Sequence, residues 1–348
     1  MIRYLRQEEK LRSRKLWEEI FTEDSPEFVD FYYSDKARRN KILVADENDE
    51  IVAMVHRNPY DVAVKNQIWR VDYIAGVATA PEKRHQGYMS GLLSRCFADM
   101  YIEKMEFCFL LPVDPAIYLP FDFTYISDLP QVVLEEKAMM KLSGRACMER
   151  SEECGDLARF AGKQLEKKYE VYTLRDEEYY RSLCREVRSA EGDLILLRTR
   201  DERERLAGVW AYYGAGQEQR EFLCLPEYGK ETASPKPQMM GRIINLEQFA
   251  RVISLKEESE VNEMELLIEV RDDLIRQNDG IFRWKLDKQG SSLTRQTGEN
   301  VLKPHISLGI AELASWLFGY GKPPVVESRR NMVERIRPLR GVFFDEVV

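Results

Sequence analysis

Residues 71–102 combine a strand pattern, a short basic loop and a helix pattern, and this succession constrains the fold more than any other part of the chain. The segment from Val71 to Thr79 has the length and the β-rich composition of a buried strand. After Gly87 apolar residues recur at the helical period, so we expect the helix to pack on a sheet with its N-terminus at the sheet edge. Unpaired backbone N–H groups at that N-terminus, beside Arg84 and His85, favour a bound pyrophosphate. The apolar stripe consists of Met89, Leu92, Leu93, Cys96, Phe97 and Met100.

The loop carries a short motif. Arg84-His85-Gln86-Gly87-Tyr88-Met89 follows the pattern Arg/Gln-x-x-Gly-x-Gly/Ala except at its last position, where Met89 replaces a small residue. This motif and its lead-in, Val-Ala-Thr-x-Pro-Glu-x-Arg at residues 77–84, resemble the acyl-coenzyme A loop of the GNAT N-acetyltransferases. An ordinary strand–turn–helix connection with solvated basic residues is the structural alternative. Nucleotide-binding loops are not expected, since neither Gly-x-x-x-x-Gly-Lys-Ser/Thr nor Gly-x-Gly-x-x-Gly occurs.

The resemblance implies that acetyl-CoA is the acyl donor. The end of the strand would hold the pantetheine arm through backbone N–H groups and help to polarise the thioester carbonyl, while the loop would hold the pyrophosphate. The implied coenzyme-binding residues are Val77, Ala78, Thr79, Arg84, His85, Gln86, Gly87, Tyr88 and Met89.

Length and composition limit the class of protein. A chain of 348 residues suggests two or three domains, and 44% hydrophobic residues suffice for packed cores. A net charge of −8 argues against general nucleic-acid binding and suits a cationic substrate. No apolar run reaches the roughly 18–20 residues that span a bilayer, so we expect no membrane association and a cytoplasmic location. The six cysteines contain no Cys-x-x-Cys pair, so neither a metal nor a disulfide framework is expected.

The pattern of elements divides the chain into three units, residues 1–135, 136–238 and 239–348. In the first unit, strand and helix patterns follow the order of the GNAT core. In the second, Arg205-Leu-Ala-Gly208 fits Arg-x-x-Gly but opens a strand pattern instead of a helix. This unit is therefore expected to be a degenerate GNAT-like lobe that cannot bind coenzyme. The proline-containing run at 231–238 predicts a linker.

The third unit has an α+β pattern. This unit opens with Met240-Gly-Arg-Ile-Ile-Asn-Leu, and the chain ends with Val342-Phe-Phe-Asp-Glu-Val-Val. With these two runs, the chain as a whole resembles the Eis-like acetyltransferases. The resemblance implies an α+β fold class, with tandem lobes of the GNAT acyl-CoA N-acyltransferase fold, a C-terminal sterol-carrier-protein-like domain, and assembly into a homo-oligomer. The expected elements of the third unit are a helix over Leu246–Ile253, a strand over Glu263–Arg271, a turn at Asn278-Asp279-Gly280 and a helix over Ile306–Leu317.

Acetyl transfer by direct attack of an amine needs a base for the amine, an oxyanion site and an acid for the departing thiolate. Tyr118 is the expected acid, on a short helix that starts at Asp114-Pro115. GNAT enzymes carry a tyrosine there that faces the coenzyme sulfur, and Ile117-Tyr118-x-x-Phe121 matches the Eis-like sequence. A phenol with a pKa of about 10 is protonated at neutral pH. The alternatives are that Tyr118 packs in the core or that Tyr125 donates the proton.

The base has no local signature, because His56, His85 and His305 are scattered. The resemblance implies that the C-terminal carboxylate, here that of Val348, is delivered to the first lobe by the third domain. An α-carboxylate has a pKa of about 3.5, so it would need burial or a water relay to act as a base. The apolar residues within 342–348 favour a docked tail, although a frayed end is the default for most chains.

The acceptor site is expected on a second helix that begins at Ser25, where GNAT proteins line the acceptor pocket. Phe28 and Tyr32 suit either substrate contact or core packing, and Asp30 suits either an ammonium or solvent. We expect an acetyl-CoA-dependent N-acetyltransferase that acts on a primary amine of a small polycationic molecule or of lysine. The alternative is a non-catalytic scaffold that binds CoA or an apolar ligand.

Overall fold

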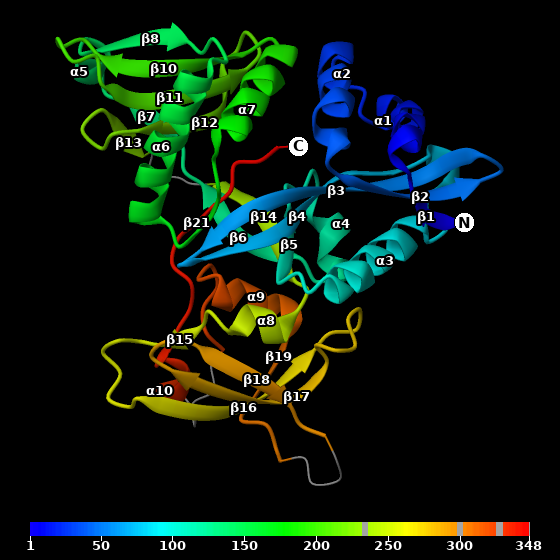
Figure 1. Cartoon of the computed structure of the whole chain (residues 1–348). Coiled ribbons are helices and arrows are strands. Elements are labelled where there is room, and N and C mark those ends of the chain that lie inside the picture. The colour runs from blue at the N-terminus through cyan, green and yellow to red at the C-terminus, as the bar shows by residue number, and fades with distance from the viewer. Residues whose placement is uncertain (232–235, 298–301, 325–329, 348) are drawn as a thin grey trace.

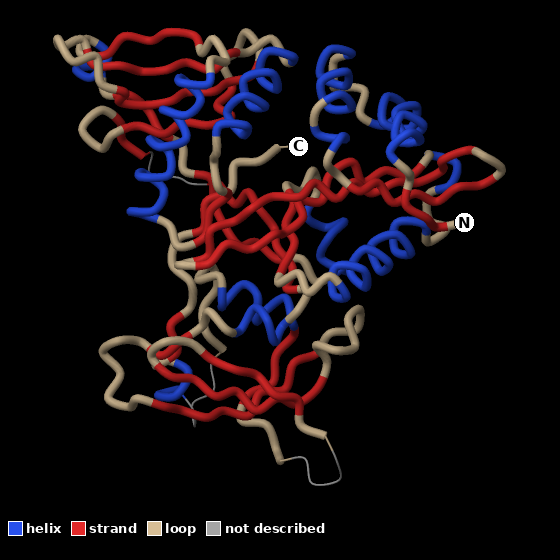
Figure 2. Tube along the Cα trace, in the orientation of Figure 1, coloured by secondary structure: helices blue, strands red, loops and turns tan. Residues whose placement is uncertain are grey.

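The computed structural model describes residues 1–231, 236–297, 302–324 and 330–347. Within these residues the centre of the molecule is a nine-stranded sheet with the order β1-β2-β3-β4-β5-β14-β6, which β9 and β21 extend beside β3 (Figures 1 and 2). The mixed sheet is antiparallel between most neighbours, but β4 and β5 are parallel. The strands are β1 (Ile2–Tyr4), β2 (Lys41–Glu47), β3 (Glu50–Val64), β4 (Gln67–Thr79), β5 (Phe107–Leu110), β6 (Thr124–Leu129), β9 (Val171–Thr173), β14 (Lys236–Ile243) and β21 (Val342–Phe343).

Helices cover both faces of the first part of this sheet, α1 and α2 on one side and α3 on the other (Figure 1). Side chains of a strand alternate between faces, so Ile42 and Val44 pack with Trp17 while Leu43 packs in the cluster that contains α3. Because both faces are covered, β2 contains an unbroken apolar run. No helix in the described ranges is long and apolar enough to span a membrane. The helices are α1 (Arg14–Ile20), α2 (Pro26–Ser34) and α3 (Tyr88–Ile102).

Two expected helix starts are confirmed. The hydroxyl of Ser25 accepts a hydrogen bond from the backbone N–H of Phe28 at 3.1 Å, which caps α2. The carboxylate of Asp114 accepts one from the N–H of Ala116 at 2.9 Å and caps α4 (Pro115–Tyr118). Local sequence therefore sets the starts of two short helices that lie near the expected site.

The second lobe repeats the order of the first elements of the first lobe. Its sheet, β12-β11-β10-β8, is antiparallel, and two helices separate its first two strands in the chain, as α1 and α2 do in the first lobe. After β12 the described chain continues into a short strand, β13 (Gly229–Glu231), where the first lobe has α3. Arg205 directly precedes β11, so the Arg-x-x-Gly sequence has no helix N-terminus behind it. The elements are β8 (Leu142–Ala146), α6 (Ser151–Lys168), α7 (Glu177–Ser189), β10 (Asp193–Thr199), β11 (Leu206–Tyr213) and β12 (Glu218–Cys224).

Strand β14 overturns part of the linker prediction. Lys236–Gln238, expected in a linker, and residues 239–243, expected to open the third domain, form one strand between β5 and β6. Pro237 is tolerated because β5 pairs only with the later part of β14, and the register shifts next to the proline. The expected boundary at residue 238 thus falls inside a strand of the first sheet, while 232–235 lie outside the described residues.

The third unit is a four-stranded sheet, β18-β17-β16-β19, with α8 and α9 between it and the first lobe (Figure 1). The hairpin at Gly280 and the strand Glu263–Arg271 are as expected. The helix expected over Ile306–Leu317 is wrong in its first turn, because Ile306–Gly309 forms β19, parallel to β16. Pairing with β16 overrides the helical preference there. The elements are α8 (Leu246–Ala250), β16 (Glu263–Arg271), β17 (Gly280–Asp287), β18 (Ser291–Arg295), β19 (Ile306–Gly309), α9 (Ile310–Leu317) and α10 (Arg330–Val333).

The C-terminal segment returns from the third unit to the space between the two lobes (Figure 1). β21 pairs in parallel with β9. Because the segment is extended there, successive side chains of the segment point to opposite sides. Phe343 packs in the core of the second lobe, whereas the ring of Phe344 stacks on Phe109 of β5 with centroids 4.3 Å apart. The segment therefore joins all three units.

We expect Phe344→Ala to lower the free energy of unfolding by about 3 kcal/mol, because it removes a fully buried ring stacked on β5. Chemical denaturation measures the change, with the exposed Met148→Ala as a control. Equal stability of Phe344→Ala and the control would contradict the docked position of the segment.

Candidate active site

The parallel pair β4 and β5 separates after two residue pairs. Asp72 lies opposite Cys108 and Tyr73 opposite Phe109, but β4 continues to Thr79 while β5 ends. On this side, the part of β4 after Tyr73 has no neighbouring strand among the described residues. Its backbone N–H and C=O groups are free to pair with an extended ligand, as a strand would.

A bulge in β4 shapes this free edge. Gly76 and Val77 lie where β3 has the single residue Val55, and Gly76 has φ +53°. A Cβ atom on Gly76 would lie 2.6 Å from the ring of Trp17, so both its conformation and its surroundings require glycine. The bulge therefore turns the last residues of β4, including Ala78, relative to the rest of the strand.

The loop between β4 and α3 is exposed and its backbone is unusual. His85 and Gly87 both have positive φ, and Gly87 precedes the first turn of α3 with no side chain capping the free N–H groups. Arg84, His85 and Gln86 are exposed beside this helix end. The geometry fits an anion at the N-terminus of a helix of 15 residues.

Two residues of the motif have other contacts. The hydroxyl of Tyr88 donates to Glu47, which also accepts from Lys83 at 2.6 Å, so the loop is tied to the β2–β3 hairpin. Met89, which stands where the GNAT loop pattern has a small residue, is partly buried against the main core. The side chains of Tyr88 and Met89 thus contact the protein, although both stay partly exposed.

Tyr118 ends α4, near the place where β5 stops (Figure 1). Its ring contacts Phe123 edge-on with centroids 5.9 Å apart, and its hydroxyl makes no hydrogen bond to a described residue. Burial raises the pKa of Tyr118 to about 12, so the phenol is protonated at neutral pH and free to donate. Tyr125, the rival, lies on β6 with its ring 6.3 Å from that of Tyr320 of the third unit.

The C-terminal segment reaches the same strand. The hydroxyl of Tyr73, at the last β4–β5 pair, donates to the backbone carbonyl of Val347 at 2.7 Å. Burial raises the pKa of Tyr73 well above its usual value, and nearby Glu346 and Tyr118 add to the effect. The end of the segment and the two phenols therefore lie close together. Val348, whose carboxylate is the expected base, lies outside the described residues.

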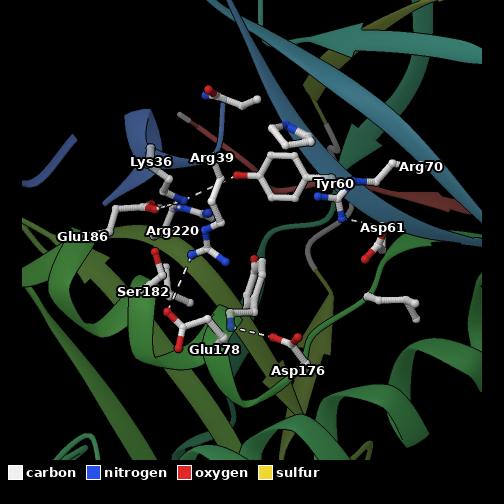
Figure 3. Close-up of a pocket in the computed structure, with 15 residues that line it drawn as sticks. Lys36, Arg39, Tyr60, Asp61, Arg70, Asp176, Glu178, Ser182, Glu186 and Arg220 are labelled. Atoms are coloured by element: carbon white, nitrogen blue, oxygen red, sulfur yellow. Dashed lines mark hydrogen bonds and ion pairs between the residues drawn. The ribbon is translucent and has the colours of Figure 1, made fainter. Parts of the chain in front are cut away.

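A cavity of about 250 Å³ lies between the two lobes (Figure 3). Lys36 of the first lobe lies 2.9 Å from Glu186 of the second, and Arg220, also of the second lobe, donates to the same carboxylate at 2.8 Å. Burial opposes ionisation of Glu186, but the two cations outweigh it and lower its pKa to about 2. The ring of Tyr60 faces these groups and lies edge-on to Tyr73 of β4, with centroids 6.2 Å apart. Arg70, also of β4, lines the cavity itself.

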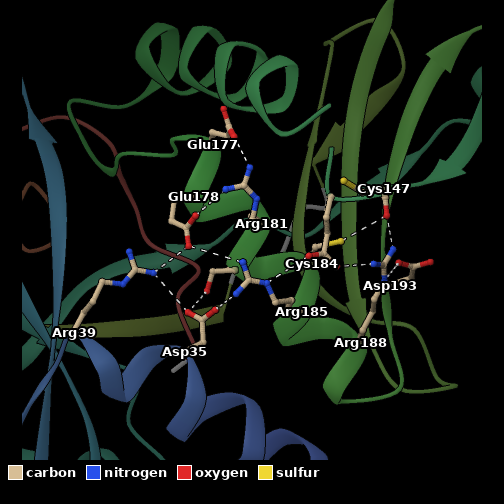
Figure 4. Close-up of polar contacts among 12 residues, drawn as sticks. Asp35, Arg39, Cys147, Glu177, Glu178, Arg181, Cys184, Arg185, Arg188 and Asp193 are labelled. Atoms are coloured by element: carbon tan, nitrogen blue, oxygen red, sulfur yellow. Dashed lines mark hydrogen bonds and ion pairs between the residues drawn. The ribbon is translucent and has the colours of Figure 1, made fainter. Parts of the chain in front are cut away.

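The cavity residues were missed by sequence reasoning. Lys36 lies in a short basic run, Lys36-Ala-Arg-Arg-Asn-Lys41, that contains no binding motif, and Glu186 and Arg220 are separated from it by well over a hundred residues. No local pattern identifies such a set. The interface itself depends on Asp35 at the end of α2, which binds Ser182 at 3.0 Å and Arg185 at 2.5 Å on α7 (Figure 4).

The expected acceptor residues do not line this cavity. Tyr32 is 0% exposed, and its hydroxyl lies 2.9 Å from Nδ1 of His56, whose pKa burial lowers to about 3. Phe28 is buried, and Asp30, which is 67% exposed, pairs with Arg14 at 2.6 Å on the outside of α2. Helix α2 turns these side chains to the core and to solvent, and Lys36, just after the helix, faces the cavity instead.

Comparison with known proteins agrees with this geometry. Residues 1–126 match the family model for an acetyltransferase (GNAT) domain, and residues 246–328 match that for a sterol carrier protein domain. No curated protein sequence matches the chain.

Solved structures with low sequence identity have the same fold over nearly the whole chain. They include a probable N-acyltransferase from Enterococcus faecalis, with 15% identity, TM-score 0.71 and coverage of 97% of this chain and 93% of that one. A GCN5-related N-acetyltransferase from Anabaena variabilis has 14% identity, TM-score 0.71 and coverage of 97% and 94%. Eis1 from Mycobacterium abscessus has 12% identity, TM-score 0.67 and coverage of 100% of both chains. Residues 1–126 are thus a GNAT acetyltransferase domain and residues 246–328 a sterol carrier protein domain, and the fold of nearly the whole chain is shared with these solved structures, Eis1 among them.

Proposed function

We propose that this protein transfers an acetyl group from acetyl-CoA to a primary amine by direct attack of the amine on the thioester. The observation that carries the proposal is the convergence at β4 of three features: a free strand edge, an uncapped helix N-terminus and the unengaged phenol of Tyr118. Acyl transfer to an amine needs a place for each part of the donor and a proton for the departing thiolate. The three features supply these requirements.

In this proposal the donor lies along β4. Backbone groups of Val77, Ala78 and Thr79 pair with the pantetheine arm, and the loop at Arg84–Gly87 holds the pyrophosphate. Bound acetyl-CoA supplies the activated thioester carbonyl. Tyr118 then donates its proton to the thiolate as the C–S bond breaks, because a protonated phenol can protonate a thiolate with a pKa of about 8–9.

The C-terminal segment supplies the base in this proposal, and the resemblance implies the carboxylate of Val348. Support comes from the hydrogen bond that holds Val347 against Tyr73, since it brings the segment to the strand that would carry the donor. The acceptor is proposed to be a primary amine of a small polycationic molecule or of lysine. A homo-oligomeric state and a cytoplasmic location stay predictions.

The scaffold alternative has less support. A cavity described in the third unit is lined largely by charged and polar side chains, among them Arg251, Glu265 and Lys285. An apolar ligand would find little to bind there. The deciding measurement is calorimetric titration of acetyl-CoA, followed by release of free thiol with spermidine, neomycin or Nα-acetyl-lysine as acceptor. Binding with thiol release supports the transferase, whereas absence of acetyl-CoA binding would leave the scaffold.

Gly87→Asp is expected to weaken acetyl-CoA binding by at least about tenfold, because it adds a carboxylate at the proposed pyrophosphate site and strains a residue with φ +85°. Calorimetric titration measures the dissociation constant. The exposed Lys167→Asp on α6 is the matched control, since it makes a larger change in net charge far from the loop. Equal affinities of the two variants would refute the loop assignment.

Tyr118→Phe is expected to lower kcat by about 100-fold while the acetyl-CoA dissociation constant stays unchanged, because only the proton for the thiolate is lost. Tyr125→Phe is the matched control and should keep kcat within about twofold of the wild type. Thiol release under saturating substrates measures both. If Tyr125→Phe were the impaired variant, the acid would be reassigned to Tyr125.

A further inference from the structure

The cavity between the lobes lies beside the strand that is proposed to hold the donor. Asn58 of β3, which lines the cavity, is directly opposite Tyr73 of β4, so the two side chains are on the same face of the sheet. Tyr73 belongs to the last β4–β5 pair, after which the edge of β4 is free. A molecule in the cavity is therefore next to the free edge along which the thioester is proposed to lie.

Three buried polar atoms that line this cavity have no hydrogen-bond partner among the described residues. They are Asn58 Nδ2, Glu186 Oε2 and the hydroxyl oxygen of Tyr179. Asn58 is 3% exposed and Glu186 is 0% exposed, so bulk solvent does not satisfy them either. Buried polar groups are almost always paired, because an unpaired one carries the full cost of its desolvation. A polar ligand in the cavity would supply the partners of all three atoms.

The contacts around these atoms determine which of them donate and which accept. Asn58 Oδ1 accepts hydrogen bonds from Tyr32 at 3.2 Å and from Asn40 at 3.0 Å, which leaves the amide nitrogen as a donor. Burial opposes the charge of Lys36, but Glu186 raises the pKa of Lys36, so it is an ammonium at neutral pH. Lys36 Nζ lies 2.9 Å from Glu186 Oε2 as an ion pair that lacks the direction of a hydrogen bond. The cavity therefore offers donors to an oxyanion and a carboxylate oxygen to an ammonium.

The size and the charge of the cavity limit its ligand. Its volume of about 250 Å³ is below the roughly 300–1,000 Å³ of sites for drug-sized molecules, so a molecule of amino-acid size fits better than a large one. Cationic and carboxylate side chains line the wall in equal numbers. A polycation would meet the cations of the wall without an excess of carboxylates, whereas a zwitterion brings one charge of each sign.

We propose that this cavity binds the α-carboxylate and α-ammonium groups of a free diamino acid such as lysine, an inference that rests on the proposed acetyl transfer. The carboxylate accepts hydrogen bonds from Lys36, Asn58 and Tyr179, and the α-ammonium donates to Glu186. The side chain extends past Tyr73 to the edge of β4, where its terminal amine meets the thioester.

The transfer itself balances as follows for lysine. The ε-ammonium gives one proton to the base in the C-terminal segment, which releases it to solvent, and the freed lone pair forms the C–N bond at the thioester carbonyl. The C–S electron pair leaves with sulfur, which takes the proton of Tyr118. The second proton lost by nitrogen restores the phenol, and the products are Nε-acetyl-lysine and free CoA.

Four acceptors separate the two charged groups that the cavity is proposed to bind. Cadaverine is lysine without the carboxylate, 6-aminohexanoate is lysine without the α-amine, and in Nα-acetyl-lysine the α-amine is blocked. With saturating acetyl-CoA, we expect kcat/KM for lysine to exceed that for each of the other three by about tenfold or more, because each lacks a charge-assisted hydrogen bond. Thiol release measures the rates, and mass spectrometry should place the acetyl group on Nε. Equal or faster use of cadaverine or spermidine, or acetylation at Nα, would overturn the proposal.

Two variants locate this preference in the cavity. Lys36→Met keeps the length of the side chain and removes its charge, so the ratio of kcat/KM for lysine to that for cadaverine should fall by about tenfold. Tyr179→Phe removes a hydroxyl that has no partner in the described structure, and the ratio should fall by about threefold. Lys41→Met, which loses an exposed ion pair with Glu103 at 2.7 Å, is the matched control and should keep the ratio. A lower ratio in either cavity variant supports the proposal, and an unchanged ratio in both refutes it.

A binding measurement separates this proposal from the proposed function. Calorimetric titration of lysine and of cadaverine is carried out on the full chain without acetyl-CoA. Tighter binding of lysine, weakened in Lys36→Met, supports the proposed ligand even if acetyl-CoA does not bind and the transferase proposal fails. If acetyl-CoA is turned over with spermidine or cadaverine while lysine binds no better than cadaverine, the transferase proposal stands and the proposed ligand is wrong.

Discussion

The stacking of Phe344 on Phe109 connects the end of the chain to the strand at which the parallel pair separates. Phe343 points the other way, into the second lobe, because successive residues of an extended segment face opposite sides. The same segment starts from the third unit, so three units share one short stretch of backbone. The position of the proposed base relative to Tyr118 depends on this packing.

Buried charge fixes the two lobes relative to each other. Lys36 and Asp35 after α2 bind Glu186 and Arg185 of α7, and the first of these pairs lies in the cavity wall. Removing one partner of a buried pair leaves the other charge uncompensated, so such contacts specify one arrangement even where their net contribution to stability is small. The arrangement encloses a space next to β4 that neither lobe forms by itself.

Local patterns identified most of the first lobe. The run from Val71 to Met100 became β4, the loop and α3, and the expected stripe of α3 is buried apart from Met89, which is partly exposed. Errors arose where distant strands decide the structure. Ile306–Gly309 is a strand because β16 lies beside it, and Lys236–Ile243 enters the first sheet because β5 and β6 leave a place between them. Neither partner strand is visible in the sequence around these segments.

By itself the sequence determined the features that depend on neighbours within a few residues. These are the period of α3, the turn at Gly87, the caps at Ser25 and Asp114, and the motif that points to a coenzyme loop. Only the tertiary structure decided which side chains of α2 face the core and which charged groups pair between the lobes. Helical spacing places residues on faces but not against neighbours, and the pairing of buried charges depends on residues more than a hundred positions apart.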